Sequence, residues 1–348
     1  MGANNAAGDV DHCTNKAVVL TKAPGTATGI TVDVAGIVGW GQKQIDISNC
    51  ENQAQITAQE ATNTTVTSRV TVAGILAYGP IANSTVKNSV NSGYIYCQYN
   101  SSAKANGRCS YTGGIVGLMA AQSGSNGTSD TRAVAGIAGL EIVNCQNTGQ
   151  VWSRNYNNTA SSLVKSSFGG GVVGAVVGTA ASKAIVLDCN SSTGKLTNYR
   201  GINGGIVGYA GNATVTNCHA SQTLDANVSS EGTGGIAGWS VASSFASCSH
   251  EGSNGPTAAE SSTYLGGLVY SVDGTSSFTN CLLKGVTMCK STNTAATAPG
   301  PLATKAASGA TFTDCGVKGT INGVAITLET PMITTDSGAT VTGTYLID

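Results

Sequence analysis

Cysteine and histidine are the residue types in this chain that could bind a metal or act as nucleophiles. The 348 residues include 11 cysteines and 3 histidines. Zinc sites usually combine closely spaced cysteine pairs with further cysteines or histidines, and this sequence has no Cys-x-x-Cys pair. We therefore predict neither a metal site nor a cofactor.

Most of the cysteines recur at one position of a repeat, at Cys13, Cys50, Cys145, Cys189, Cys218, Cys248, Cys281 and Cys315. A buried thiol behaves as a small apolar side chain, so a stack of thiols needs no covalent bond. Neighbours in parallel register also orient their Cβ atoms alike, which suits a disulfide poorly. We predict a column of reduced thiols in the core. Cys97 and Cys109 instead flank a loop, where a disulfide and two separate thiols are both compatible with the spacing.

Ionisable residues that could catalyse a reaction do not gather when the repeats are aligned. Glycosidases need a pair of carboxyl groups flanking one bond, and no such pair emerges. His219 and His250 fall on neighbouring repeats and could approach each other, but surface histidines are more often solvated than catalytic. A protein without enzymatic activity is favoured, and a polysaccharide lyase or glycoside hydrolase is the alternative.

Aromatic residues are the better candidates for ligand binding. A first set follows the glycine-rich core of the repeat and comprises Trp40, Tyr78, Tyr209 and Trp239. Stacked repeats would align these rings into a stripe, which could face solvent and bind the apolar faces of sugars, or pack under a loop or in the core. A second set comprises Tyr96, Tyr99, Trp152 and Tyr156. It could form a binding rim or anchor loops.

Two half-repeats must position these residues. The first reads small-Gly-apolar-apolar-Gly, as in residues 35–39, 204–208 and 234–238, and the second reads apolar-x-Asn/Asp-Cys. Short runs of Val, Ile and Thr bounded by Gly and Asn predict strands, and a regular period predicts a solenoid. The additional copy at Gly136 is interpreted as an extra strand or hairpin inserted in one coil.

The predicted fold is an all-β parallel solenoid of about nine coils over residues 1–322, closed by antiparallel capping strands over residues 323–348. The residue before the cysteine position is an asparagine at Asn49, Asn88, Asn144, Asn217 and Asn280. Asparagine tolerates left-handed backbone, so we predict a bend at this position and a ladder of side-chain amides along it.

The composition of the chain limits the classes of binding partner that are expected. Only 10% of residues are charged and the net charge is −1, so no basic face for nucleic acid is visible. No apolar run approaches the roughly 20 residues of a membrane helix, so membrane insertion is not expected. The first residues lack the features of a signal peptide, and we expect the sequence to be part of a longer chain.

The glycine-rich cores resemble the GLUG-motif repeat family. They read Gly36-Ile-Val-Gly39, Gly114-Ile-Val-Gly117 and Gly205-Ile-Val-Gly208, among others. The segment 144–149 also resembles large surface proteins of gut Bacteroidetes. The resemblance implies a right-handed parallel β-helix in a secreted or surface-anchored bacterial protein, often an adhesin, and it carries no catalytic residues.

The sequence thus favours an extracellular or cell-surface, adhesin-like module that binds glycans or a host or bacterial surface protein. A passive stalk that displays other domains is the second expectation.

Overall fold

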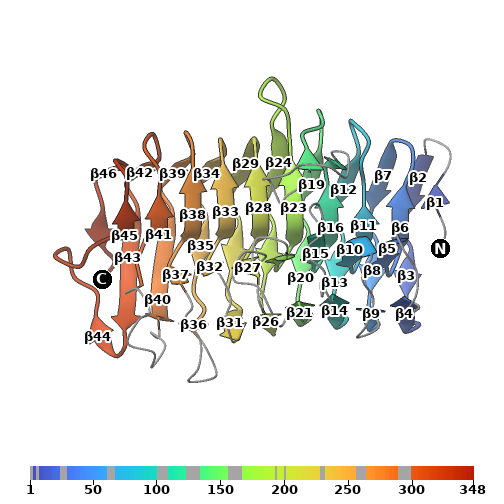
Figure 1. Ribbon diagram of the computed structural model, residues 1–348, viewed down its shortest axis with the longest axis horizontal. Coiled ribbons are helices and arrows are strands. Elements are labelled where there is room, and N and C mark those ends of the chain that lie inside the picture. The colour runs from blue at the N-terminus through green and yellow to red at the C-terminus, as the bar shows by residue number, and fades with distance from the viewer. Residues whose placement is uncertain are drawn as a thin grey trace.

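Parallel strands stacked along one axis make up the protein. The computed structural model describes residues 3–4, 8–23, 30–60, 67–99, 109–122, 134–155, 167–192, 194–199, 201–227, 232–255, 264–288 and 299–348. The strands lie side by side from one end of a rod to the other, with the two termini at opposite ends (Figure 1). Within these ranges there is no helix, so none could span a membrane. The predicted all-β parallel solenoid is confirmed.

We name the four sheets D, A, B and C in the order in which a full rung passes through them, as β5, β6, β7, β8 and β9 do in sequence. The first rung and the last two have no named strand in sheet D. Sheet D contains β5 (Ile30–Ala35), β10 (Thr67–Ala73), β15 (Cys109–Gly113), β22 (Ser167–Gly170), β27 (Ile202–Gly204), β32 (Gly232–Gly234) and β37 (Tyr264–Gly266). Sheet A contains β1 (Ala3–Asn4), β6 (Val38–Gly41), β11 (Leu76–Tyr78), β16 (Val116–Met119), β23 (Val173–Val177), β28 (Val207–Gly211), β33 (Ala237–Val241), β38 (Val269–Asp273), β41 (Ala303–Ala306) and β45 (Ile333–Asp336).

The Asn/Asp-Cys half-repeat forms sheet B and leads into sheet C. Sheet B contains β2 (Gly8–Asp11), β7 (Ile45–Ser48), β12 (Thr85–Lys87), β19 (Glu141–Val143), β24 (Ala184–Leu187), β29 (Ala213–Thr216), β34 (Ser244–Ala246), β39 (Ser277–Thr279), β42 (Thr311–Thr313) and β46 (Thr340–Thr342).

Sheet C takes two strands from most rungs. The first strands are β3 (Thr14–Asn15), β8 (Glu51–Asn52), β13 (Val90–Asn91), β20 (Gln146–Asn147), β25 (Asn190–Ser191), β30 (His219–Ala220) and β35 (Ser249–His250). The second strands are β4 (Val19–Ala23), β9 (Ile56–Glu60), β14 (Ile95–Tyr99), β21 (Val151–Asn155), β26 (Lys195–Tyr199), β31 (Thr223–Asn227) and β36 (Asn254–Gly255). In the last rungs the strands are β40 (Leu282–Met288), β43 (Gly316–Ile321), β44 (Val324–Ala325) and β47 (Tyr345–Leu346).

Register places like residues above one another. Val215 pairs with Phe245, which pairs with Phe278, which pairs with Phe312. The three phenylalanine rings stack with centroids 4.5 and 5.0 Å apart. Because a slip of one residue would turn this apolar column to the other face of the sheet, the repeated pattern fixes the register.

Two irregular segments depart from the plain stack. The copy of the glycine motif at Gly136 follows a short antiparallel pair, β17 (Ala121–Gln122) with β18 (Val134–Ala135), as an inserted hairpin would.

The C-terminal segment differs from the antiparallel cap expected over residues 323–348. Only β44 pairs antiparallel, with β43. Strands β45, β46 and β47 pair in parallel with β41, β42 and β43. Val341 lies on Phe312 and Ile333 lies on Ala303, so the segment supplies the apolar residues of a further rung although it has no cysteine.

Candidate functional site

A left-handed corner joins sheets B and C in every rung. The residue before the cysteine position has a φ angle between 49° and 54° at His12, Asn49, Asn88, Asn144, Asp188, Asn217, Ser247, Asn280 and Asp314. Asn and Asp adopt this conformation more easily than most residues, because their short side chains hydrogen-bond to nearby groups. The corner therefore explains why Asn or Asp so often precedes the cysteine.

The five asparagines predicted at the corner form one exposed column. Amide bonds link some of its members: Nδ2 of Asn144 donates to Oδ1 of Asn88 at 2.8 Å. In the same way Asn217 donates to Asp188 at 2.6 Å. These are separate links between neighbouring rungs, and among the described residues they do not join into one continuous ladder.

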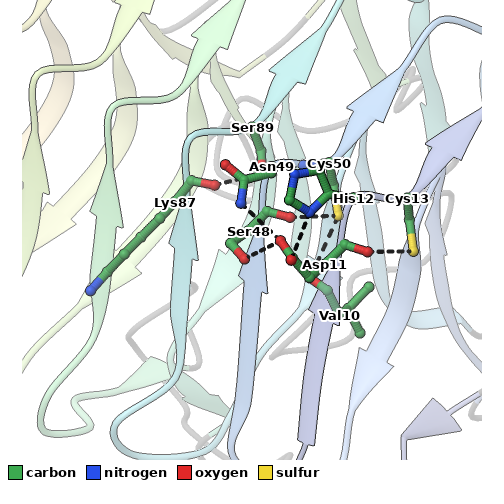
Figure 2. Close-up of polar contacts among 9 residues, drawn as sticks. All are labelled: Val10, Asp11, His12, Cys13, Ser48, Asn49, Cys50, Lys87 and Ser89. Carbon is green, nitrogen blue, oxygen red and sulfur yellow. Dashed lines mark hydrogen bonds and ion pairs between the residues drawn. The ribbon is translucent and has the colours of Figure 1, made fainter.

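At the first corners the polar groups satisfy one another, as Figure 2 shows around Asp11. The Asp11 carboxylate accepts hydrogen bonds from Ser48 Oγ at 2.6 Å and Asn49 Nδ2 at 2.8 Å, and it lies 2.7 Å from Nδ1 of His12. These bonds, that from Ser48 foremost, hold the pKa of Asp11 well below its usual range. Ser48, Asp11 and His12 are not arranged as a catalytic triad, because the Ser48 hydroxyl donates to the Asp11 carboxylate and not to the His12 imidazole.

The same corner is hollowed further along the rod. A depression of about 360 Å³ is lined by Asn144, Asp188, Asn190, Asn217, Cys218, His219, Ser247 and Ser249. We call it the corner depression. The lining consists mainly of amide, hydroxyl, carboxylate and imidazole groups, and Nδ1 of His219 lies 2.7 Å from the hydroxyl of Ser249.

A second asparagine column, not predicted from the sequence, runs inside the solenoid. It starts at Asn15 and continues through Asn52, Asn91 and Asn147, and in each step Nδ2 donates to Oδ1 of the next asparagine at 2.7–2.8 Å. Each Nδ2 also donates to the backbone carbonyl two residues ahead. The signal was present as the recurrent Cys-x-Asn, or Ser-x-Asn at Ser89, that follows the corner.

The interior column also explains the first glycine of the Gly-x-x-Gly core. A Cβ atom on Gly74 would lie 2.5 Å from Oδ1 of Asn91 and 2.4 Å from the carbonyl oxygen of Gly114. Four rungs later, a Cβ on Gly235 would lie 2.5 Å from the His250 ring. The glycine of one half-repeat therefore makes room for the interior side chain of the other.

The repeat cysteines lie directly after the corner and point into the core. All eight are unlinked thiols, and all but Cys13 are buried. Their Sγ atoms donate weakly to backbone carbonyls, as Cys145 does to Val143 at 3.4 Å and to Val86 at 3.5 Å. Burial raises the pKa of Cys315 to about 11, so that thiol stays protonated and is a poor nucleophile.

The loop cysteines are only partly described. Cys97 is buried between Ala58 and Ser153 of the neighbouring rungs. The side chain of Cys109 lies outside the described residues, and a disulfide between these two cysteines stays one of the two alternatives that the loop spacing allows.

The predicted aromatic stripe is aligned, but most of it does not face solvent. Tyr78, Tyr209 and Trp239 are 5–7% exposed. They belong to a cluster separate from the main core, which sheet D completes with Tyr111 and Phe168. Of the two arrangements expected from the sequence, these three residues adopt the packing layer and not the binding surface, because rings from two sheets cover one another.

Trp40, at the first end of the stripe, is 39% exposed and stacks on Tyr78 with ring centroids 6.3 Å apart. The guanidinium of Arg69 lies 3.5 Å from the centre of the Tyr78 ring and contacts the Asp33 carboxylate at 2.7 Å. The register places Asp33 and Thr71 in the column that Tyr111 and Phe168 occupy in later rungs, and the Arg69 side chain reaches from the same sheet to the Tyr78 ring.

The second aromatic set lies on the outward side of sheet C. The Tyr96 and Trp152 rings meet edge to face with centroids 5.2 Å apart, and Tyr94 lies 6.1 Å from Tyr96. All three side chains are half-buried, and we call them the aromatic patch. Tyr156 and the side chain of Tyr99 lie outside the described residues.

Polar groups border the aromatic patch. Tyr96 Oη donates to Oε1 of Gln98 at 2.9 Å, and the Arg154 guanidinium lies 5.8 Å from the centre of the Trp152 ring. Burial raises the pKa of Tyr94 to about 12, so its hydroxyl remains a neutral donor. The patch combines ring faces with donors and acceptors, the two contact types that a sugar uses.

The two histidines on neighbouring rungs point to opposite sides. His219 is partly exposed, whereas His250 is fully buried, with Nε2 2.7 Å from Oδ1 of Asn254. The strand register continues the interior column from Asn147 through Ser191 and Ala220 to His250. Burial lowers the pKa of His250 to about 4. The described residues contain no group of three His, Cys, Asp or Glu side chains placed to hold a metal ion.

Comparisons with known proteins give little functional information. No family model and no curated protein matches the chain. Among solved structures, it is similar to that of a candidate immunoglobulin A1 protease from Bacteroides ovatus, with 13% sequence identity and a TM-score of 0.40. That likeness covers 92% of this chain and 78% of the other. At this level of similarity nothing about activity follows.

Proposed function

We propose that this chain is a non-catalytic, adhesin-like module of a secreted or cell-surface bacterial protein, and that it binds glycans through the aromatic patch. The observation that carries the proposal is the pairing of Tyr96 and Trp152 on the outward side of sheet C. Aromatic rings bind the apolar faces of sugars, and neighbouring polar groups fix their orientation.

The scaffold supports such a role. Tyr96 and Trp152 of the aromatic patch come from β14 and β21, which pair over five residues in continuous register, and Tyr94 directly precedes β14. Sites built on strands hold their geometry better than sites on loops. A ligand would therefore meet rings whose spacing is already set, and less conformational entropy would be lost on binding.

A glycan array tests the proposal, with the wild-type chain compared with Trp152→Ala. Loss of one stacking ring should weaken binding about tenfold. Trp40→Ala removes an exposed ring from a different sheet and serves as the matched control, which should bind like wild type. Thermal unfolding of both variants shows whether a lost signal reflects misfolding, and Gln98→Ala gives a second test at a half-buried polar group that borders the patch.

A passive stalk is the second candidate, and burial of the aromatic stripe favours it. It predicts that the folded wild-type chain gives no signal on any array. A surface protein as partner predicts binding to cells that survives removal of their glycans. Turnover of pectins or other polyuronates would instead support an enzyme.

A further inference from the structure

We infer that the corner depression is a second binding site, separate from the aromatic patch, which takes one neutral sugar unit through its hydroxyl groups. Its volume of about 360 Å³ falls at the lower end of the range of small-molecule sites. No Phe, Tyr or Trp ring lines it. Contacts there would be hydrogen bonds to hydroxyl groups, whereas contacts at the aromatic patch would be to ring faces.

The polar groups of the depression are held in place before any ligand arrives. Asn144, Asp188, Asn217 and Ser247 share the left-handed corner conformation, with φ between 51° and 54°. Asn217 donates to Oδ1 of Asp188, and the His219 ring is oriented by Ser249, which is only 9% exposed. Preorganised donors and acceptors bind with less loss of entropy.

Capacity for further hydrogen bonds distinguishes this corner from the one around Asp11. Three neighbours contact the Asp11 carboxylate (Figure 2). Among the described residues, the Asp188 carboxylate accepts one such bond, at Oδ1. A carboxylate has about four acceptor positions, so Asp188 can accept two hydroxyl groups of a ligand.

The chemistry of the lining selects a neutral ligand. Asp188 would repel an anion, and the nearby Glu251, 4.0 Å from the His219 ring, is already paired with Lys284 at 3.3 Å. Calcium takes six to eight oxygen ligands, usually including several carboxylates, and only one carboxylate lines the depression. Amides and a carboxylate side by side match the paired hydroxyls of a sugar, which can donate and accept.

The test is a titration of the whole chain, with its asparagines labelled with ¹⁵N, against methyl glycosides of glucose, galactose, mannose and N-acetylglucosamine. The side-chain amide signals of Asn144, Asn190 and Asn217 report on the depression. We expect saturable shifts of these signals with at least one glycoside, in wild type and in Trp152→Ala alike. Failure of the aromatic patch on a glycan array would therefore leave this result standing.

Two substitutions locate the binding. Asp188→Asn introduces the residue found at most other corners, so the backbone conformation is kept while the charge is removed. It should weaken binding about tenfold, the loss expected for one charge-assisted hydrogen bond. Ser247→Asn restores the residue found at most other corners and narrows the depression, so it should abolish the shifts without loss of thermal stability. Asp314→Asn is the matched control, since it makes the same change at a corner outside the depression.

The inference is overturned if no glycoside shifts these signals, or if the shifts persist in both Asp188→Asn and Ser247→Asn. It is also overturned if Asp314→Asn weakens binding as much as Asp188→Asn does, because the effect would then not belong to the depression.

Discussion

Two columns of asparagine run along this rod. Their members are three positions apart in the sequence of each rung, and the two columns have different structural roles. The corner column contains Asn88 and Asn144, is exposed, and has left-handed backbone. The interior column contains Asn91 and Asn147, is at most 2% exposed, and has each amide bonded to the next. The residue type is the same, but the corner uses the backbone tolerance of asparagine and the interior uses its amide.

The difference teaches how a solenoid tolerates polar residues in its core. A buried amide is stable only when its donors and acceptors are paired. The rise of one rung places each amide beside the next, so each asparagine completes its neighbour's hydrogen bonds. At the corner, water can satisfy the amide, and the side-chain bonds between rungs are therefore optional.

The largest expected effect comes from the same substitution in the two columns. Asn91→Asp removes both donor bonds of Asn91, to Gly93 and Asn147, and sets a buried carboxylate against those two acceptors. We expect the free energy of unfolding to fall by about 3–5 kcal/mol, the range found when a buried charge is left uncompensated.

Asn88→Asp, three residues earlier, should change stability by less than about 0.5 kcal/mol, as surface substitutions usually do. Asp188 and Asp314 already occupy that corner position in other rungs. Urea denaturation of both variants measures the difference. Equal destabilisation would show that the two columns are not distinct.

Acid should destabilise the interior column at its later end, where His250 stands. Its folded pKa is about 4 and its ordinary value is 6.5, so between these values the unfolded chain binds more protons. The free energy of unfolding should therefore fall as the pH drops from about 6.5 to about 4, by about 3 kcal/mol in total.

His250→Gln should lose this part of the pH dependence, because an amide can donate to Asn254 without titrating. His219→Gln, on the outer side of the adjacent rung, should keep it. Thermal or urea unfolding across this pH window measures both slopes. A wild-type slope no steeper than that of His250→Gln would contradict the prediction.

The smallest expected effect isolates the corner backbone. Asn217→Gly and Asn217→Val both remove the bond to Asp188, but only valine is strained at a φ of 52°. Valine should therefore be less stable than glycine by about 1–2 kcal/mol, the steric penalty of left-handed backbone. If the Gly and Val variants unfold at the same urea concentration, the preference for Asn or Asp at the corner comes from side-chain hydrogen bonding and not from backbone conformation.

The sequence by itself determined the solenoid, the stacked cysteines and the left-handed corner. Each depends on a local rule applied at a repeated spacing: alternation of apolar residues in strands, and the backbone preference of Asn or Asp before Cys50, Cys189 or Cys218. Because the pattern repeats many times, a departure from it at a single position, such as Ser89 in place of cysteine or Ser247 in place of Asn or Asp, does not alter the prediction.

Only the tertiary structure decided which repeated side chains meet solvent. Tyr209 and Trp239 are buried because rings of sheet D pack against them, and no spacing within one repeat encodes that contact. His219 and His250 differ in burial because each follows its cysteine at a different distance, one residue against two, and successive side chains of a strand point to opposite faces. The interior asparagines differ in burial from those at the corner because the chain bends between them, and the bend determines which side chains point inward.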